Sequence, residues 1–165
     1  MNERVLLSEK DGLVREAGRA VETTPIAVCV TCMSVVRPAK VKFIETLGRG
    51  WKHYVHEHPL TIIRLKRSGQ ERSIEYVGQT IPDWLRRSVE KMWYEWKAPP
   101  EEVAYKVRLL LDAYRMLLKT FRCYGATVSE LPLPTVKSVH EPDWLHDFAL
   151  RLYLNTPRAC REEGW

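Results

Sequence analysis

The sequence contains no apolar run that could cross a membrane, because none approaches the roughly 18 residues that such a span requires. It also has no low-complexity segment. Its beginning, MNERVLLSEKDG, carries too many charges for a secretory signal peptide. We therefore expect an intracellular protein, or one assembled into a virion inside a cell, with no membrane partner.

Sequence signatures of catalysis are missing as well. The chain has neither a P-loop nor a Gly-x-Gly-x-x-Gly segment, and no Ser-His-Asp arrangement or paired carboxylates stand out. Asp83 and Asp143 are better explained as residues that begin helices. We predict that the protein is not an enzyme and has no small-molecule substrate. A CxxC oxidoreductase or a metal-dependent nuclease is the alternative prediction.

Excess positive charge is confined to one part of the 165-residue chain, whose net charge is +5. Residues 1–36 have a net charge of −1, residues 37–72 of +6, and residues 73–165 of zero. Such a segment suits a polyanion, so we predict contacts with nucleic acid, with double-stranded DNA as the first candidate. A solvated basic face without a partner is the alternative. Phosphate contacts give little sequence specificity. The predicted contact residues are Arg37, Lys40, Lys42, Arg49, Lys52, Arg64, Lys66, Arg67 and Arg72.

The periodicity predicts a mainly α fold. A helical bundle is expected over about 80–155, after a small α+β part with a β-hairpin over about 60–77. The strongest helix signal starts at Pro100 and ends near Gly125, with an apolar stripe whose steps alternate between four and three residues. The stripe consists of Val103, Val107, Leu110, Tyr114, Leu117 and Phe121.

Weaker signals complete the predicted fold. Helices are expected from Ser8 to Val21, over about 82–97 and over 142–155, with a loop at 131–141. IAVCVTCMSVV (26–36) suits a strand or hairpin, with a helix as the alternative. We divide the chain into a basic part, 1–79, and a helical scaffold and self-association part, 80–165, and one compact domain is the alternative.

Two of the four cysteines and three of the five histidines lie between residues 29 and 58. Two of each form the pattern C-x2-C-x20-H-x4-H. It resembles a two-Cys/two-His zinc finger over residues 29–58, although a finger usually has about twelve central residues. The resemblance implies a structural zinc ion held by Cys29, Cys32, His53 and His58, with His56 as a competing ligand. A buried cysteine pair with surface histidines, and a redox CxxC, are the alternatives.

The remaining cysteines, Cys123 and Cys160, are most simply a buried helix residue and a tail residue. A disulfide between them is the alternative if the source is a hyperthermophile. Abundant Trp, Tyr, Arg, Lys and Glu suit a thermophilic source.

A second resemblance involves TTPIAV (23–28) and LLKTFRCYGATVSEL (117–131). These segments and their order are similar to the helical coat proteins of filamentous archaeal viruses, which wrap DNA. The predicted hairpin and the Cys/His cluster depart from that plan. The resemblance implies, as an alternative function, a structural nucleoprotein that wraps double-stranded DNA and assembles with itself.

Overall fold

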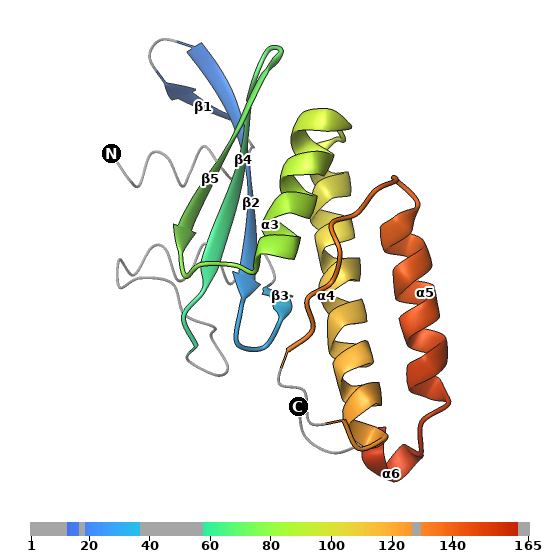
Figure 1. The fold of residues 1–165 in the computed structure, drawn as a ribbon. Helices are drawn as coiled ribbons and strands as arrows, with labels where there is room; N and C mark the ends of the chain where they lie inside the picture. Colours follow the sequence, from blue (N-terminus) through green and yellow to red (C-terminus); the bar gives the residue numbers. More distant parts are fainter. Residues whose placement is uncertain (1–12, 17–18, 37–57, 127–129, 162–165) are drawn as a thin grey trace.

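The computed structural model describes residues 13–16, 19–36, 58–126 and 130–161, which form a β-sheet and a set of helices (Figure 1). The strands are β1 (Leu13–Glu16), β2 (Arg19–Cys29), β3 (Ser34–Val36), β4 (Thr61–Ser68) and β5 (Glu71–Gly78). The helices are α3 (Asp83–Glu90), the π-helical turn η1 (Lys91–Glu95), α4 (Pro100–Cys123), α5 (Glu141–Leu154) and α6 (Arg158–Arg161).

The fold is mixed α+β rather than mainly α. The hairpin expected over about 60–77 is confirmed as β4 and β5, joined through Gly69 and Gln70. The predicted helix from Ser8 to Val21 is wrong within the described residues, because residues 13–16 belong to β1 and residues 19–21 to β2. The stretch from Val21 to Val28 is rich in β-branched residues, which favour a strand over a helix.

The sheet is antiparallel and has the strand order β1-β2-β4-β5, with β3 paired to the end of β2. β2 and β4 pair continuously, and Ile26 lies opposite Ile63, which in turn lies opposite Tyr76. Pro25 lies within β2, where the edge away from β4 has no strand partner in the described segments between the β1 and β3 pairings. A residue without a backbone N–H is tolerated at such an edge.

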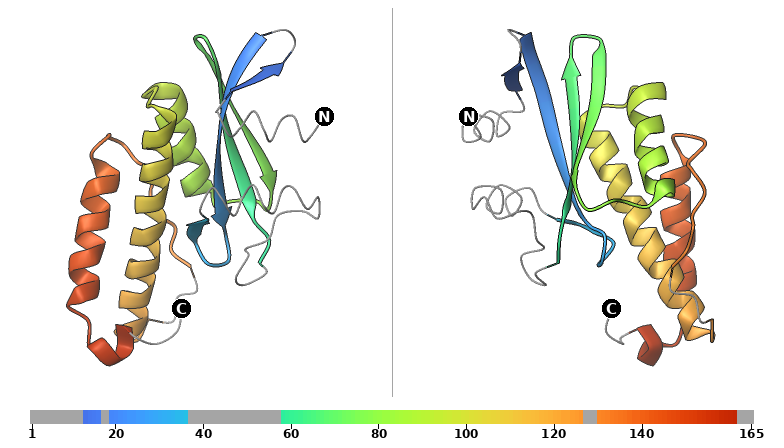
Figure 2. Two further views of the ribbon diagram at one scale, coloured as in Figure 1. Left: turned by 180° about the vertical axis from the view of Figure 1, so that it is seen from behind. Right: turned by 60° about the vertical axis from the view of Figure 1, so that its left-hand side comes forward.

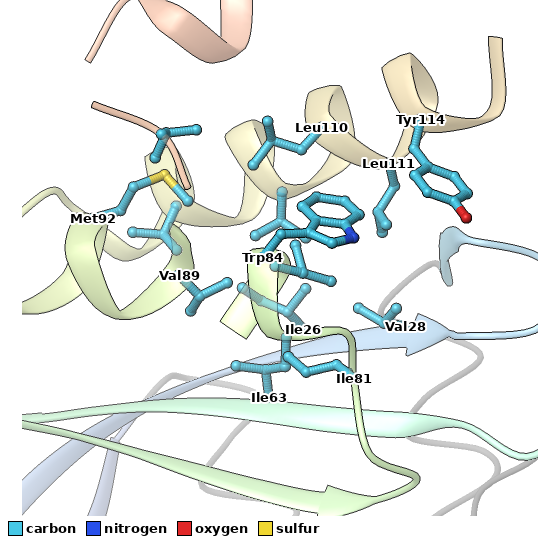
Figure 3. Close-up of a cluster of buried hydrophobic side chains, with 14 of the residues drawn as sticks. Ile26, Val28, Ile63, Ile81, Trp84, Val89, Met92, Leu110, Leu111 and Tyr114 are labelled. Carbon is cyan, nitrogen blue, oxygen red and sulfur yellow. The ribbon is translucent and has the colours of Figure 1, made fainter. Parts of the chain in front are cut away.

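Helices cover one face of the sheet and form two layers (Figure 2). The first layer contains α3, η1 and α4, and α5 packs on the far side of α4. The main core joins sheet residues such as Ile26 and Ile63 to Trp84 and Val89 of α3 and to Leu110 of α4 (Figure 3). Hydrophobic contacts therefore connect the two predicted parts of the chain.

The helix predictions after residue 80 are confirmed. α3 and η1 span the segment expected at 82–97, and α5 lies where the last helix was expected. α4 ends at Cys123, and Gly125, which follows two residues later, has a φ of +90°. The Ala126 N–H donates to the Phe121 carbonyl at 3.0 Å. This is the hydrogen bond of a glycine-based helix cap. A disulfide between Cys123 and Cys160 fastens α6 to this end of α4.

Replacing Gly78 with alanine is expected to reduce the free energy of unfolding by about 2–4 kcal/mol. Gly78 has φ +106°, and a Cβ there would lie 2.3 Å from the Leu60 carbonyl oxygen. Gly69, with φ +60° and nothing within 4 Å of a built Cβ, provides the matched control. Urea unfolding should show the larger loss for Gly78→Ala, and equal losses would contradict the steric argument.

Candidate metal centre

Two cysteines meet where β2 turns into β3. Cys29 is the last residue of β2 and is fully buried, and Cys32 lies in the following turn. The turn closes at Met33, whose φ of 52° is in the left-handed region. The Cys32 N–H donates to the Cys29 sulfur at 3.3 Å. This local geometry holds both sulfur atoms on the same side of the hairpin.

His58 reaches the cysteines through the register of the sheet. Val28 of β2 lies opposite Thr61 of β4, so the residues before Thr61 run beside the turn that holds Cys32. The His58 Nδ1 lies 3.2 Å from the Cys32 sulfur and 3.7 Å from the Cys29 sulfur. Pairing between strands that are distant in sequence therefore completes a cluster of three donor atoms.

The donor set and its spacing fit a zinc ion. The three donor atoms lie within 4.8 Å of one another. Zinc–sulfur and zinc–nitrogen bonds in a tetrahedral site place neighbouring donors about 3.5–3.8 Å apart. The two sulfur–nitrogen distances, 3.2 and 3.7 Å, are close to this range. Thiolate and imidazole ligands are also the donors that zinc prefers.

The Cys32 thiol is held in its protonated form when no cation is bound. Burial, reinforced by a hydrogen bond and the charge interaction with Cys29, raises the pKa of Cys32 to about 11, and Arg115 partly opposes the shift. A bound metal ion reverses this preference because it deprotonates the thiols that it coordinates. A raised pKa is the opposite of what a redox-active CxxC cysteine requires.

The structure brings together Cys29, Cys32 and His58 of the predicted zinc ligands, which supports a possible Cys/His metal site. His53 and His56 lie outside the described residues. The choice among the three clustered histidines could not be made from spacing alone. The β2–β4 register places His58 beside the turn.

The predicted nucleic-acid contacts in the described segments lie on both faces of the sheet. Arg64 and Lys66 lie on the face away from the helices, and both form ion pairs with Glu75. The Arg64 Nε lies 3.9 Å and the Lys66 Nζ 3.4 Å from the Glu75 Oε1. Arg67 and Arg72 belong to the opposite face, because side chains alternate along a strand. The remaining predicted contacts lie outside the described residues: Arg37, Lys40, Lys42, Arg49 and Lys52.

The two arginines on the helix-facing side have partners within the fold. Arg67 forms an ion pair with Glu22 at 2.7 Å. The Arg72 guanidinium donates to the carbonyls of Trp93, Lys97 and Ala98 at 2.8–3.2 Å. It also lies 4.1 Å from the centre of the Trp93 ring. Burial lowers the pKa of Arg72. Arg72 thus stabilises the end of the first helical layer against the sheet.

A cleft of about 940 Å³ opens beside the metal cluster. The turn at 30–33, the start of α3, the second half of α4 and residues 130–135 surround it, and Cys32 and His58 form part of its wall. Beneath it, Trp84 stacks on Tyr114 with ring centres 5.6 Å apart. The sequence contains no signal for this cleft, because five separate segments of the chain form it.

Among the described residues, no helix combines the length and the apolar character that crossing a membrane requires. No family model, no curated protein and no solved structure matches this chain.

Proposed function

We propose that this chain is a non-enzymatic, zinc-binding protein that binds nucleic acid with low sequence specificity. Double-stranded DNA is the first candidate for that nucleic acid. The observation that carries the proposal is the meeting of Cys29, Cys32 and His58 at one point of the fold. Residues 37–57 lie between the cysteines and His58 in the sequence. An ion held by these donors would join the two ends of that segment.

The joined segment contains much of the positive charge of the protein. Five of the nine Lys/Arg residues of the 37–72 segment precede His58. Two more, Arg64 and Lys66, follow on the face of β4 away from the helices, where they are partly buried and paired with Glu75. Zinc would thus hold the two ends of a basic segment at one point of the fold, beside Arg64 and Lys66, and these cations together would contact a phosphate backbone. Phosphate contact alone explains the low specificity that we propose.

Binding of the zinc-loaded protein to a fluorescently labelled 20-base-pair DNA duplex tests this function. The affinity should fall linearly with the logarithm of the salt concentration. Neutralising Arg64 and Lys66 as a pair, R64Q/K66Q, should reduce the magnitude of that slope by about 1.8, or about 0.9 per lost phosphate contact. Fluorescence anisotropy between 50 and 200 mM salt measures both quantities.

The matched control removes the same charge from the helical layers. Arg108 and Arg151 are exposed residues of α4 and α5, so R108Q/R151Q should leave the slope close to the wild-type value. An equal effect of both double variants would show that net charge, and not the basic segment, determines binding. No binding at 50 mM salt would exclude the nucleic-acid function and leave the metal site to be tested on its own.

A further inference from the structure

The metal cluster and the cleft share a wall. Cys32 and His58 line the cleft, and Cys29 lies fully buried behind them. A purely structural zinc site needs no such opening, since its four positions are filled by protein ligands. The three donors that the described residues provide leave one tetrahedral position for another ligand.

We propose that the cleft binds an organic anion with an apolar body, and that its acid group is the fourth ligand of a zinc ion held by Cys29, Cys32 and His58. This inference rests on the zinc site of the proposed function. It departs from the closed site, and from the absence of a small-molecule ligand, that the sequence predicts.

The size of the cleft supports a ligand larger than a simple ion. Sites for small organic molecules usually have volumes of about 300–1,000 Å³ and mostly apolar walls with a few polar groups. The volume of the cleft, about 940 Å³, lies within this range. Its apolar walls come from the cysteine turn, the start of α3, α4 and the loop before α5: Met33, Trp84, Leu118, Leu131 and Leu133.

One arginine in the wall of the cleft supports an anion as the ligand. Arg87 is exposed on α3, and its side chain forms no ion pair or hydrogen bond within the described part of the chain. Arg122 lines the same space from the last turn of α4. The lining also contains two acidic residues, Asp83 and Glu130. Asp83 forms an ion pair with Arg86 at 3.3 Å.

Arg87 has a specific part in this arrangement. Two thiolates balance the charge of a zinc ion, so the ion alone attracts a further anion only weakly. A guanidinium facing the same space adds a charge-assisted hydrogen bond to a carboxylate or phosphate. We therefore expect Arg87 to contribute to anion affinity without contributing to metal affinity.

Cobalt(II) in place of zinc makes the site visible, because the absorption of the ion depends on its ligands. The full-length protein should bind one equivalent of cobalt, and phenylacetate should change the visible spectrum in a saturable way. Acetate, which lacks the apolar body, should bind at least tenfold more weakly. R87A should weaken phenylacetate binding about tenfold, as expected for one lost charge-assisted hydrogen bond. R108A, at an exposed position of α4 outside the cleft, should not.

Each failure has a separate meaning. Cobalt binding with a spectrum that phenylacetate leaves unchanged would overturn the inference and keep the zinc site. A spectral change in H53A or H56A would then identify the protein residue that closes the site. Equal affinity for acetate and phenylacetate would overturn the apolar part of the site. No cobalt binding would overturn the zinc site itself, and the inference with it.

Discussion

Replacing Trp93 with alanine is expected to reduce the free energy of unfolding by about 3–5 kcal/mol. Trp93 is fully buried in η1, and its indole N–H donates to the Ser73 carbonyl of β5 at 3.0 Å. The Arg72 guanidinium lies over its ring and binds the helix-end carbonyls. The truncation would create a cavity between sheet and helices, leave the Ser73 carbonyl without its donor and remove the cation–π contact.

Two further tryptophan variants separate these causes in urea unfolding. W93F keeps most of the buried ring volume but loses the hydrogen bond, so it should cost about 1–3 kcal/mol. W144A truncates a tryptophan that is 63% exposed and stacks on Phe148, so it should cost less than about 1 kcal/mol. If W93A were no more destabilising than W144A, the contacts of Trp93 between the sheet and the first helical layer would not contribute to stability.

Local patterns predicted the helical half of the fold well. The apolar stripe of α4 and its end near Gly125 depend on residues within one helix, and the β4–β5 hairpin depends on two adjacent runs. The end of β2 and β3 lie where a strand or hairpin was predicted, at 26–36. The first part of β2 was missed because the apolar residues before Thr23 also fit a helical period. What makes this segment a strand is its pairing with β4, about forty residues later in the chain. A local period contains no information about such a partner.

The candidate site shows the same division. The CxxC pair is visible in the sequence because both thiols belong to one turn. His58 was among the predicted ligands, and a strand register places it beside the turn. Charge counting also included Arg72, although its guanidinium binds carbonyls at the helix end. The cleft and Arg87 could not be predicted, because their environment forms only when 30–33, α3 and 130–135 meet.

Zinc is expected to stabilise the protein by about 3–4 kcal/mol when its free concentration is 100–1,000 times the dissociation constant. Its donors join the β2–β3 turn to the chain entering β4, beside a small core that contains Ala27, Val36, Leu60 and Ile62. The main core contains none of the three donors, so the protein should remain folded in a chelator, unlike a zinc finger. Melting temperatures with zinc and with EDTA measure the difference.

Variants can assign this stabilisation to the cluster. C32S and H58A should each melt in zinc as the wild type melts in EDTA, because either change removes one of the three donors. H140A, at an exposed histidine before α5, should retain the full response to zinc. Elemental analysis should find one zinc per chain in the wild type and H140A, and none in C32S. A wild type that melts identically in zinc and in EDTA would exclude the metal centre. The close approach of Cys29, Cys32 and His58 would then have to be explained by packing alone.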